Sequence, residues 1–423
     1  MRTIYSAILT LCAPLLLLRL WLKGRKAPAY RHRWQERFGA NLPASAVGKS
    51  HVWFHTVSVG ETIAAAPIIE AILATPNPPR VVVTTMTPTG SDRVKALYGD
   101  RVEHVYCPWD LPWAIALFWR HFNPALVVMM ETEVWPNIIA KSKAKGVQII
   151  LANARMSEKS AKGYEKISSL SKNAFAGFDL VLAQSKDDAR RLKRLGVTEA
   201  ALKTVGSVKF DVMATADQIN QGLDLKSILG GERFVWVAAS THKGEDEVML
   251  RVHRSLQEYY PSALLLIVPR HPERFNDVLE LAQRESNACL RTSLTADHPL
   301  DGNASVVVGD TMGEMMSFFA AGDAAVIGGS FVPHGGHNVL EPAALGKPVA
   351  SGPYVHNFQA ICDEMNEQQA LTICDDEAPL VRWLAELAES PKARDAAGSA
   401  SLDFLEARRG SLKRQVDYIK SGL

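Results

Sequence analysis

The chain has 423 residues, of which 47% are hydrophobic and 22% are charged, and its formal net charge is +2. This balance is typical of a globular protein and excludes a largely disordered chain. The length predicts two domains, and the small net charge provides no overall basic excess of the kind that binds nucleic acid. The five cysteines are scattered without a Cys-x-x-Cys spacing, so we expect free thiols and neither a zinc site nor a disulfide framework.

An apolar segment opens the chain. Between Ile4 and Leu22 the only charged residue is Arg19, and basic residues follow from Lys23 onward. About 20 apolar residues span a bilayer, and basic residues directly after a span hold that side in the cytoplasm. We therefore predict that residues 1–22 anchor the chain in a membrane, with the rest on the cytoplasmic side. A helix lying in the interface and a cleaved signal peptide are the alternatives, and the basic residues either attract an anionic membrane surface or only set the orientation.

Short β-rich runs alternate with helical segments through the rest of the chain. Near-continuous apolar strands separated by helices predict parallel sheets that are covered on both faces. Strands are expected at 51–55, 80–86, 104–106, 126–130, 148–152 and 180–183, and then at 234–238, 263–268, 305–308, 324–327 and 348–350. The stretch 211–231 lacks a strong apolar period, so we expect a linker there between a first domain (23–210) and a second domain (232–401). The predicted fold is α/β, with two facing doubly wound domains and a cleft between them.

Polar and glycine residues follow nearly every predicted strand. Ligands of doubly wound sheets bind outside the carboxyl ends of the strands, so these loops are the candidate site. Glu61 lies at the start of a predicted helix, where it is either part of a capping box with Ser58 or a general base. Glu131 either forms an ion pair at the sheet edge or acts on the acceptor and the transition state. Lys209, taken alone, fits a surface lysine.

The loops of the second half contain residues suited to a nucleotide. Arg270, after Pro269, is placed to pair with a phosphate, and a plain ion pair with a carboxylate is the alternative. A glycine-bracketed turn and a later helix start would add backbone donors and carboxylates; they contribute Met312, Gly313, Glu314, Asn338, Val339, Leu340 and Glu341. His334 and His337 have no acidic or cysteine partner at ligand spacing, and the chain contains no Asp-x-Asp, so we expect no metal.

Ten ordered motifs along the whole chain resemble those of the 3-deoxy-D-manno-octulosonic acid (Kdo) transferases, which modify lipid A precursors in Gram-negative bacteria. They are GRKAPAYRHRWQERFG, HTVSVGETIAAAP, TTMTPTGSDR, METEVWPN, NARMSEKS, GSVKFD, STHKGE, VPRHPERF, GDTMGEM and GGHNVLEPA. Val339 and Met156 stand where we expect proline and leucine in this pattern.

The resemblance implies a GT-B type fold of two Rossmann-like domains, with a C-terminal helix (402–423) that packs back on the first domain. It implies metal-independent, inverting transfer of Kdo from CMP-Kdo to a lipid A precursor, lipid IVA, in lipopolysaccharide core biosynthesis at the inner membrane. Glu61 would be the general base, and Glu131 and Lys209 would stabilise the transition state. CMP would be held by Pro269, Arg270, 312–314 and 338–341. A UDP-sugar transferase or epimerase of the same fold and a non-catalytic membrane scaffold are the competing hypotheses.

Overall fold

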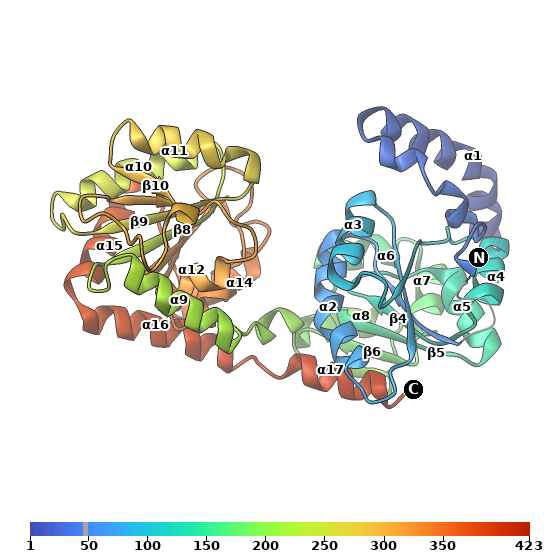
Figure 1. Cartoon of the computed structure of the whole chain (residues 1–423). Coiled ribbons are helices and arrows are strands. Elements are labelled where there is room, and N and C mark those ends of the chain that lie inside the picture. The colour runs from blue at the N-terminus through green and yellow to red at the C-terminus, as the bar shows by residue number, and fades with distance from the viewer. Residues whose placement is uncertain (45–49) are drawn as a thin grey trace. The chain divides into compact units, whose positions relative to one another are not determined.

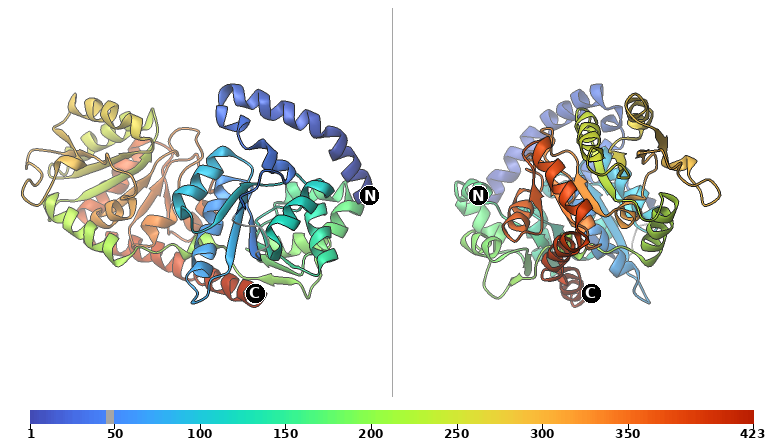
Figure 2. Two further views of the ribbon diagram at one scale, coloured as in Figure 1. Left: turned by 45° about the vertical axis from the view of Figure 1, so that its right-hand side comes forward. Right: turned by 90° about the vertical axis from the view of Figure 1, so that its left-hand side faces the viewer.

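The structure is a computed structural model that describes residues 1–44 and 50–423. The chain divides into two compact units (Figures 1 and 2). The first unit comprises Met1–Asp211 and Arg409–Leu423, and the second comprises Val212–Arg408.

The first unit is built on a seven-stranded sheet of order β3-β2-β1-β4-β5-β6-β7, in which each adjacent pair is parallel. The strands are β1 (His51–His55), β2 (Arg80–Thr85), β3 (Glu103–Tyr106), β4 (Pro124–Met130), β5 (Gln148–Ala154), β6 (Leu180–Ala183) and β7 (Leu202–Thr204). The helices are α1 (Arg2–Lys26), α2 (Val59–Leu73), α3 (Pro88–Tyr98), α4 (Pro112–Phe122), α5 (Pro136–Lys145), α6 (Glu158–Glu165), α7 (Ser168–Phe175), α8 (Lys186–Arg194) and α17 (Ser411–Lys420).

Side chains of the central strands alternate between the two faces of the sheet, and each face packs in its own core. Trp53 of β1 packs in a core that includes Phe118 of α4, while its neighbour Phe54 packs in a core that includes Ile69 of α2. Successive side chains of a strand point to opposite faces, so a strand covered by helices on both sides is apolar throughout. The predicted two-sided parallel sheet is therefore confirmed.

The second unit repeats this plan with the strand order β10-β11-β9-β8-β12-β13-β14, again parallel throughout. Its strands are β8 (Val235–Thr241), β9 (Leu264–Pro269), β10 (Ala288–Leu290), β11 (Val306–Val308), β12 (Ala324–Ile327), β13 (Val349–Ser351) and β14 (Thr372–Ile373). Its helices are α9 (Ala216–Ile228), α10 (Glu245–Gln257), α11 (Phe275–Gln283), α12 (Met315–Ala321), α13 (Leu340–Ala343), α14 (Gln359–Glu367), α15 (Glu377–Glu389) and α16 (Pro391–Glu406).

The two units divide after Asp211, at the start of the stretch 211–231 in which we expected the boundary. This stretch also contains α9, which a capping box between Thr215 and Gln218 starts and whose Gly222 lies closely against α12. The segment 402–423, expected to be one helix, is divided between two helices. The chain ends α16 at Glu406 and starts α17 at Ser411, after Gly410 adopts a left-handed φ of 90° that favours glycine.

Helix α1 is the one described helix that is long and apolar enough to cross a membrane. It also makes contacts with the rest of the first unit. Near its start, Ser6 shares hydrogen bonds of 2.9 and 3.1 Å with Asn137 of α5. Further along, Leu17 and Leu20 belong to an apolar cluster with Phe38 and Trp109. One face of α1 therefore packs on protein.

Candidate functional site

Glu61 lies in the first turn of α2 and is 7% exposed. Ser58 caps the helix, because its hydroxyl accepts the Glu61 N–H at 3.2 Å. The Glu61 carboxylate accepts the Ser58 hydroxyl at 2.9 Å and the backbone N–H of Val57 at 2.7 Å. The expected capping arrangement is thus present in a shifted form, since the carboxylate takes the N–H of the residue before the cap. The carboxylate can therefore support the helix start and also accept a proton from a substrate.

Burial raises the pKa of Glu61 to about 7, and the negative charges of Glu133 and Glu131 add to this effect. The hydrogen bonds from Val57 and Ser58 oppose it. The position at the helix start favours the ionised carboxylate, but the cost of burying the charge is larger. A carboxylate with a pKa near 7 takes up and releases a proton close to neutral pH, as a general base must.

The loop after β4 holds two further carboxylates. Glu131 is 5% exposed, has a φ of 54°, and accepts the Arg155 guanidinium at 2.7 Å. Glu133 accepts the indole N–H of Trp135 at 2.5 Å, and burial raises the pKa of Glu133. The ion pair considered for Glu131 therefore exists, with Arg155 as the partner. A left-handed glutamate is uncommon, and such strain concentrates at functional sites.

Lys209 lies in a short 3-10 helix (Val208–Asp211) near Glu131. Burial lowers the pKa of Lys209, and the Glu131 carboxylate opposes this effect. Lys209 is half-buried and interacts with Glu131, so it is not the plain surface lysine that its motif alone suggested. The structure thus brings Glu61, Glu131 and Lys209 together in one unit.

The C-terminal helix α17 holds the segment that carries Lys209. Gln415 accepts the backbone N–H of Asn153 at 2.8 Å and donates to the carbonyl of Gly206. The Asp211 carboxylate accepts two backbone N–H groups at the start of α17, from Gly410 at 2.6 Å and Leu412 at 2.7 Å. The Asn153 side chain in turn accepts the N–H of Val208 at 3.2 Å. Sequence reasoning missed Gln415, because no local signal links it to residues more than 200 positions away.

In the second unit, the loops after β11, β9, β8 and β12 meet at one edge of the sheet, since these strands are neighbours and parallel. Arg270 follows β9 directly and is exposed, and its backbone N–H donates to the carbonyl of Thr241 at 3.0 Å. No residue in the described ranges forms an ion pair with its guanidinium. Strand β9 extends through Pro269, one residue beyond its expected end at 268.

Glu341 lies close to Arg270. Burial raises the pKa of Glu341, while a hydrogen bond from Asn338 and the positive charge of Arg270 oppose the rise. The Asn338 amide donates to Glu341 at 3.1 Å and its carbonyl accepts the N–H of Leu340. Val339 is 1% exposed and Leu340 is 0% exposed, so both residues pack inside this loop.

The turn before α12 presents a second set of groups. Met312 is 62% exposed, and Gly313 has a φ of 90° with open space around its Cα. Glu314 accepts the Thr311 hydroxyl and lies 3.5 Å from the Arg291 guanidinium. Glu314 is therefore held in place by its neighbours, and the exposed backbone of this turn remains open to a ligand.

Four histidines gather beside Arg270, which the sequence did not reveal. His242 and His337 lie with their Nε2 atoms 2.8 Å apart, and the rings of His242 and His334 stack at 4.2 Å. The rings of His271 and His242 meet edge to face at 5.5 Å. Burial, together with the neighbouring charged groups, lowers the pKa of His242 and of His337 to about 4. In the described part of the chain, no three metal-binding side chains converge as they would around an ion.

One carboxylate organises these histidine loops. Glu245, at the start of α10, is 0% exposed and accepts four backbone N–H groups. The donors are His242 at 2.9 Å, Gly329 at 2.7 Å, Ser330 at 3.0 Å and Phe331 at 2.8 Å. Because one buried acceptor pairs with two loops, it fixes the loop after β8 against the loop after β12.

Two parallel α/β units, with buried carboxylates and a lysine in one and the loops around Arg270 in the other, form a fold of the GT-B type. Over 89% of the chain, the fold matches that of a glycosyltransferase from Rickettsia africae ESF-5 with a TM-score of 0.54 and 13% identity, a match that covers 99% of that protein. Residues 32–212 match the model of the family described as 3-deoxy-D-manno-octulosonic-acid transferase (kdotransferase).

The chain belongs to the 3-deoxy-D-manno-octulosonic acid transferase family. It is 39% identical to the 3-deoxy-D-manno-octulosonic acid transferase of Haemophilus influenzae over 99% of this chain and 98% of that protein. It is 34% identical to the enzyme of the same name from Bordetella pertussis over 100% of this chain and 99% of that protein.

Proposed function

We propose that this enzyme transfers Kdo from CMP-Kdo to a hydroxyl group of a lipid A precursor, lipid IVA, in lipopolysaccharide biosynthesis. The observation that carries the proposal is the buried Glu61 carboxylate, with a pKa of about 7, beside Glu131 and Lys209 in a member of the Kdo transferase family. Membership in the family indicates that Kdo is the transferred sugar, and Glu61 is the group that accepts the proton of the acceptor hydroxyl.

The reaction is a single displacement at the anomeric carbon, which inverts its configuration. The acceptor oxygen attacks this carbon, and its proton passes to the Glu61 carboxylate. The bond from the anomeric carbon to the phosphate oxygen breaks, and its electron pair leaves with CMP. The Glu131 carboxylate stabilises the positive charge that develops on the sugar, and Lys209 stabilises the negative charge of the leaving phosphate. Arg155, paired with Glu131 at 2.7 Å, positions that carboxylate.

The second unit binds the donor through its nucleotide. Arg270, whose guanidinium is exposed beside β9, pairs with the phosphate. Glu341, next to Asn338, accepts hydrogen bonds from the ribose hydroxyls. The turn at Met312–Gly313 offers backbone N–H groups to the base or the phosphate. Cationic side chains and backbone donors can neutralise a single leaving phosphate, and the proposed reaction uses no metal.

An enzyme that acts on a lipid acceptor has to reach the membrane, and α1 is suited to this. Helix α1 is apolar, and the basic residues Lys23, Arg25 and Lys26 fill its last turn. Anionic lipid attracts such a cluster, at about 1 kcal/mol per basic residue near the surface. We therefore place the enzyme on the cytoplasmic face of the inner membrane.

A transfer assay with Glu61→Ala tests the proposal. The variant should retain wild-type CMP binding, measured by thermal shift, and should lose transfer from CMP-Kdo to lipid IVA by at least about 100-fold, as expected for the loss of a general base. Near-normal turnover would remove Glu61 from this role. In the wild type, stabilisation by UDP and not by CMP would contradict the donor assignment.

A further inference from the structure

An apolar cavity of about 250 Å³ lies between α1 and the body of the first unit. Leu9 and Leu16 of α1 contribute one wall, and Met86, Trp109 and Trp135 contribute to the opposite wall. The carboxylate of Asp110, which also borders the cavity, is already satisfied, because it accepts the N–H groups of α5 at 3.0 Å. The cavity therefore presents mainly hydrocarbon and aromatic surface to an occupant.

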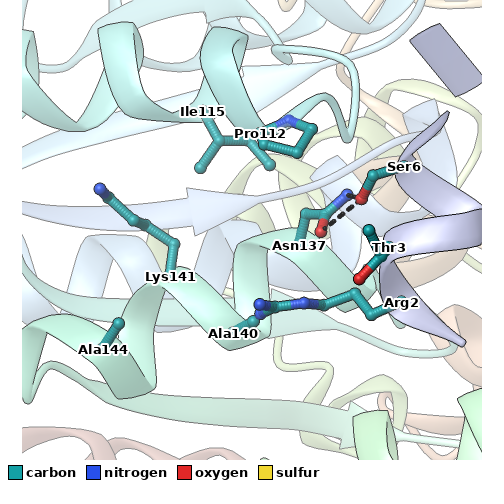
Figure 3. A pocket seen from close by; sticks show the side chains of 9 residues that line it. All are labelled: Arg2, Thr3, Ser6, Pro112, Ile115, Asn137, Ala140, Lys141 and Ala144. Carbon is teal, nitrogen blue, oxygen red and sulfur yellow. Dashed lines mark hydrogen bonds between the residues drawn. The ribbon is translucent and has the colours of Figure 1, made fainter.

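The helix that covers this cavity is tied down at both ends. Near its start, Tyr5 hydrogen-bonds Asp110. Ser6 pairs with Asn137 in the adjoining pocket that Figure 3 shows. Near its end, Leu17 and Leu20 pack in the apolar cluster with Phe38 and Trp109. Anchored on both sides of the cavity, α1 acts as a fixed wall.

The opposite face of α1 is apolar and exposed. A stripe at intervals of three or four residues carries large hydrophobic side chains, of which Leu11 is 79% exposed and Leu15 is 64% exposed. A continuous exposed apolar stripe is unfavourable in water and is suited to the hydrocarbon region of a membrane. Since the first turns of α1 are bonded to Asp110 and Asn137 of the first unit, α1 in this arrangement lies along that unit, with its outer face toward lipid.

The cavity also lies next to Glu133, a carboxylate that interacts with Glu61. Trp135, which lines the cavity, donates its indole N–H to Glu133 at 2.5 Å. The charge of Glu133 in turn raises the pKa of Glu61, so the two carboxylates interact. An acceptor whose hydroxyl reaches Glu61 therefore has a neighbouring apolar pocket for a hydrocarbon chain.

We propose that this cavity binds an acyl chain of the acceptor lipid, with α1 lying in the plane of the membrane above it. This inference rests on the proposed transfer to a lipid. Each methylene group that enters the cavity should contribute about fourfold in affinity. The pocket would thus select acylated acceptors and hold their hydroxyl group at Glu61.

The test compares a pocket-filling variant with a matched change on the outer face of the same helix. Leu16→Trp fills the cavity, whereas Leu15→Trp adds the same side chain to the exposed stripe. Transfer is measured to an acylated acceptor and to its water-soluble deacylated form in detergent. Leu16→Trp should raise the KM for the acylated acceptor by about tenfold or more, because the acyl chain loses the contacts of two or three methylene groups. The KM for the deacylated form should not change. Leu15→Trp should change neither.

A photoreactive acceptor, with the reactive group at the end of its acyl chain, gives a second readout on the wild-type enzyme. Labelling should fall on Leu9, Leu16 or Met86. Equal KM values of the wild type for both acceptors, or labelling of the outer stripe alone, would overturn the pocket while leaving the transfer reaction intact. Transfer to neither acceptor would instead contradict the proposed function, and the labelling pattern would still decide the pocket.

Discussion

Replacing Glu61 by glutamine should stabilise the enzyme at alkaline pH while it abolishes transfer. The pKa of Glu61 is about 7, against 4.5 for the same group in an unfolded chain. One pKa unit corresponds to about 1.36 kcal/mol, so keeping Glu61 ionised costs the folded state about 3 kcal/mol at pH 8. Because the folded pKa is raised, this cost is absent below pH 4.5 and grows as pH rises to about 7. The glutamine variant keeps the shape of the side chain and does not carry this cost.

Thermal unfolding between pH 4.5 and pH 8 measures this effect. At pH 8 the Tm of Glu61→Gln should exceed that of the wild type by about 6 to 12 °C, and the two should converge near pH 4.5. Glu70→Gln is the control on the same helix, because an ion pair with Arg101 lowers the pKa of Glu70, so this change should not stabilise the protein at pH 8. For the wild type, kcat/KM should fall tenfold per pH unit below about pH 7. A Glu61→Gln variant no more stable than the wild type at pH 8 would refute the reasoning.

Three further predictions concern the binding loops and the helix that supports Lys209. Arg270→Ala should weaken CMP binding by about tenfold or more, since it removes a charge-assisted hydrogen bond, whereas Arg284→Ala, at the end of α11, should leave CMP titrations unchanged. Glu245→Gln should destabilise the enzyme by about 1.5 to 3 kcal/mol in denaturant unfolding, because a buried acceptor of four N–H groups loses its charge; the exposed Glu247→Gln should have little effect. Gln415→Leu should reduce kcat with CMP binding unchanged, and wild-type turnover in this variant would argue against support of Lys209 by α17.

The charged groups of the site could be identified in the sequence, but their environment could not. Glu61 was recognisable as a capping residue, which the structure confirms, and as a candidate base, which stays a prediction. Its raised pKa depends on burial and on Glu133, which a linear pattern does not specify. Arg155 directly follows β5, and its pairing with Glu131 depends on the positions of two neighbouring strands.

Lys209 illustrates the same limit. Its motif alone favoured a surface lysine, and only the Kdo transferase resemblance assigned it a role in the reaction. The structure places it beside Glu131, on a segment that Gln415 and Asp211 attach to α17. The four histidines beside Arg270 were likewise scattered over nearly 100 residues, and their stacking comes from loops that Glu245 fixes.

The sequence by itself determined the two parallel sheets, the apolar first helix and the family, because strand hydrophobicity, helix caps and ordered motifs are local properties of the chain. Tertiary structure alone decided that 211–231 contains a packed helix, that α17 holds the Lys209 segment, and that an apolar cavity lies beneath α1. These features depend on contacts between residues far apart in the chain, and burial at such contacts, rather than residue type, sets the pKa of Glu61 and the shape of the pocket.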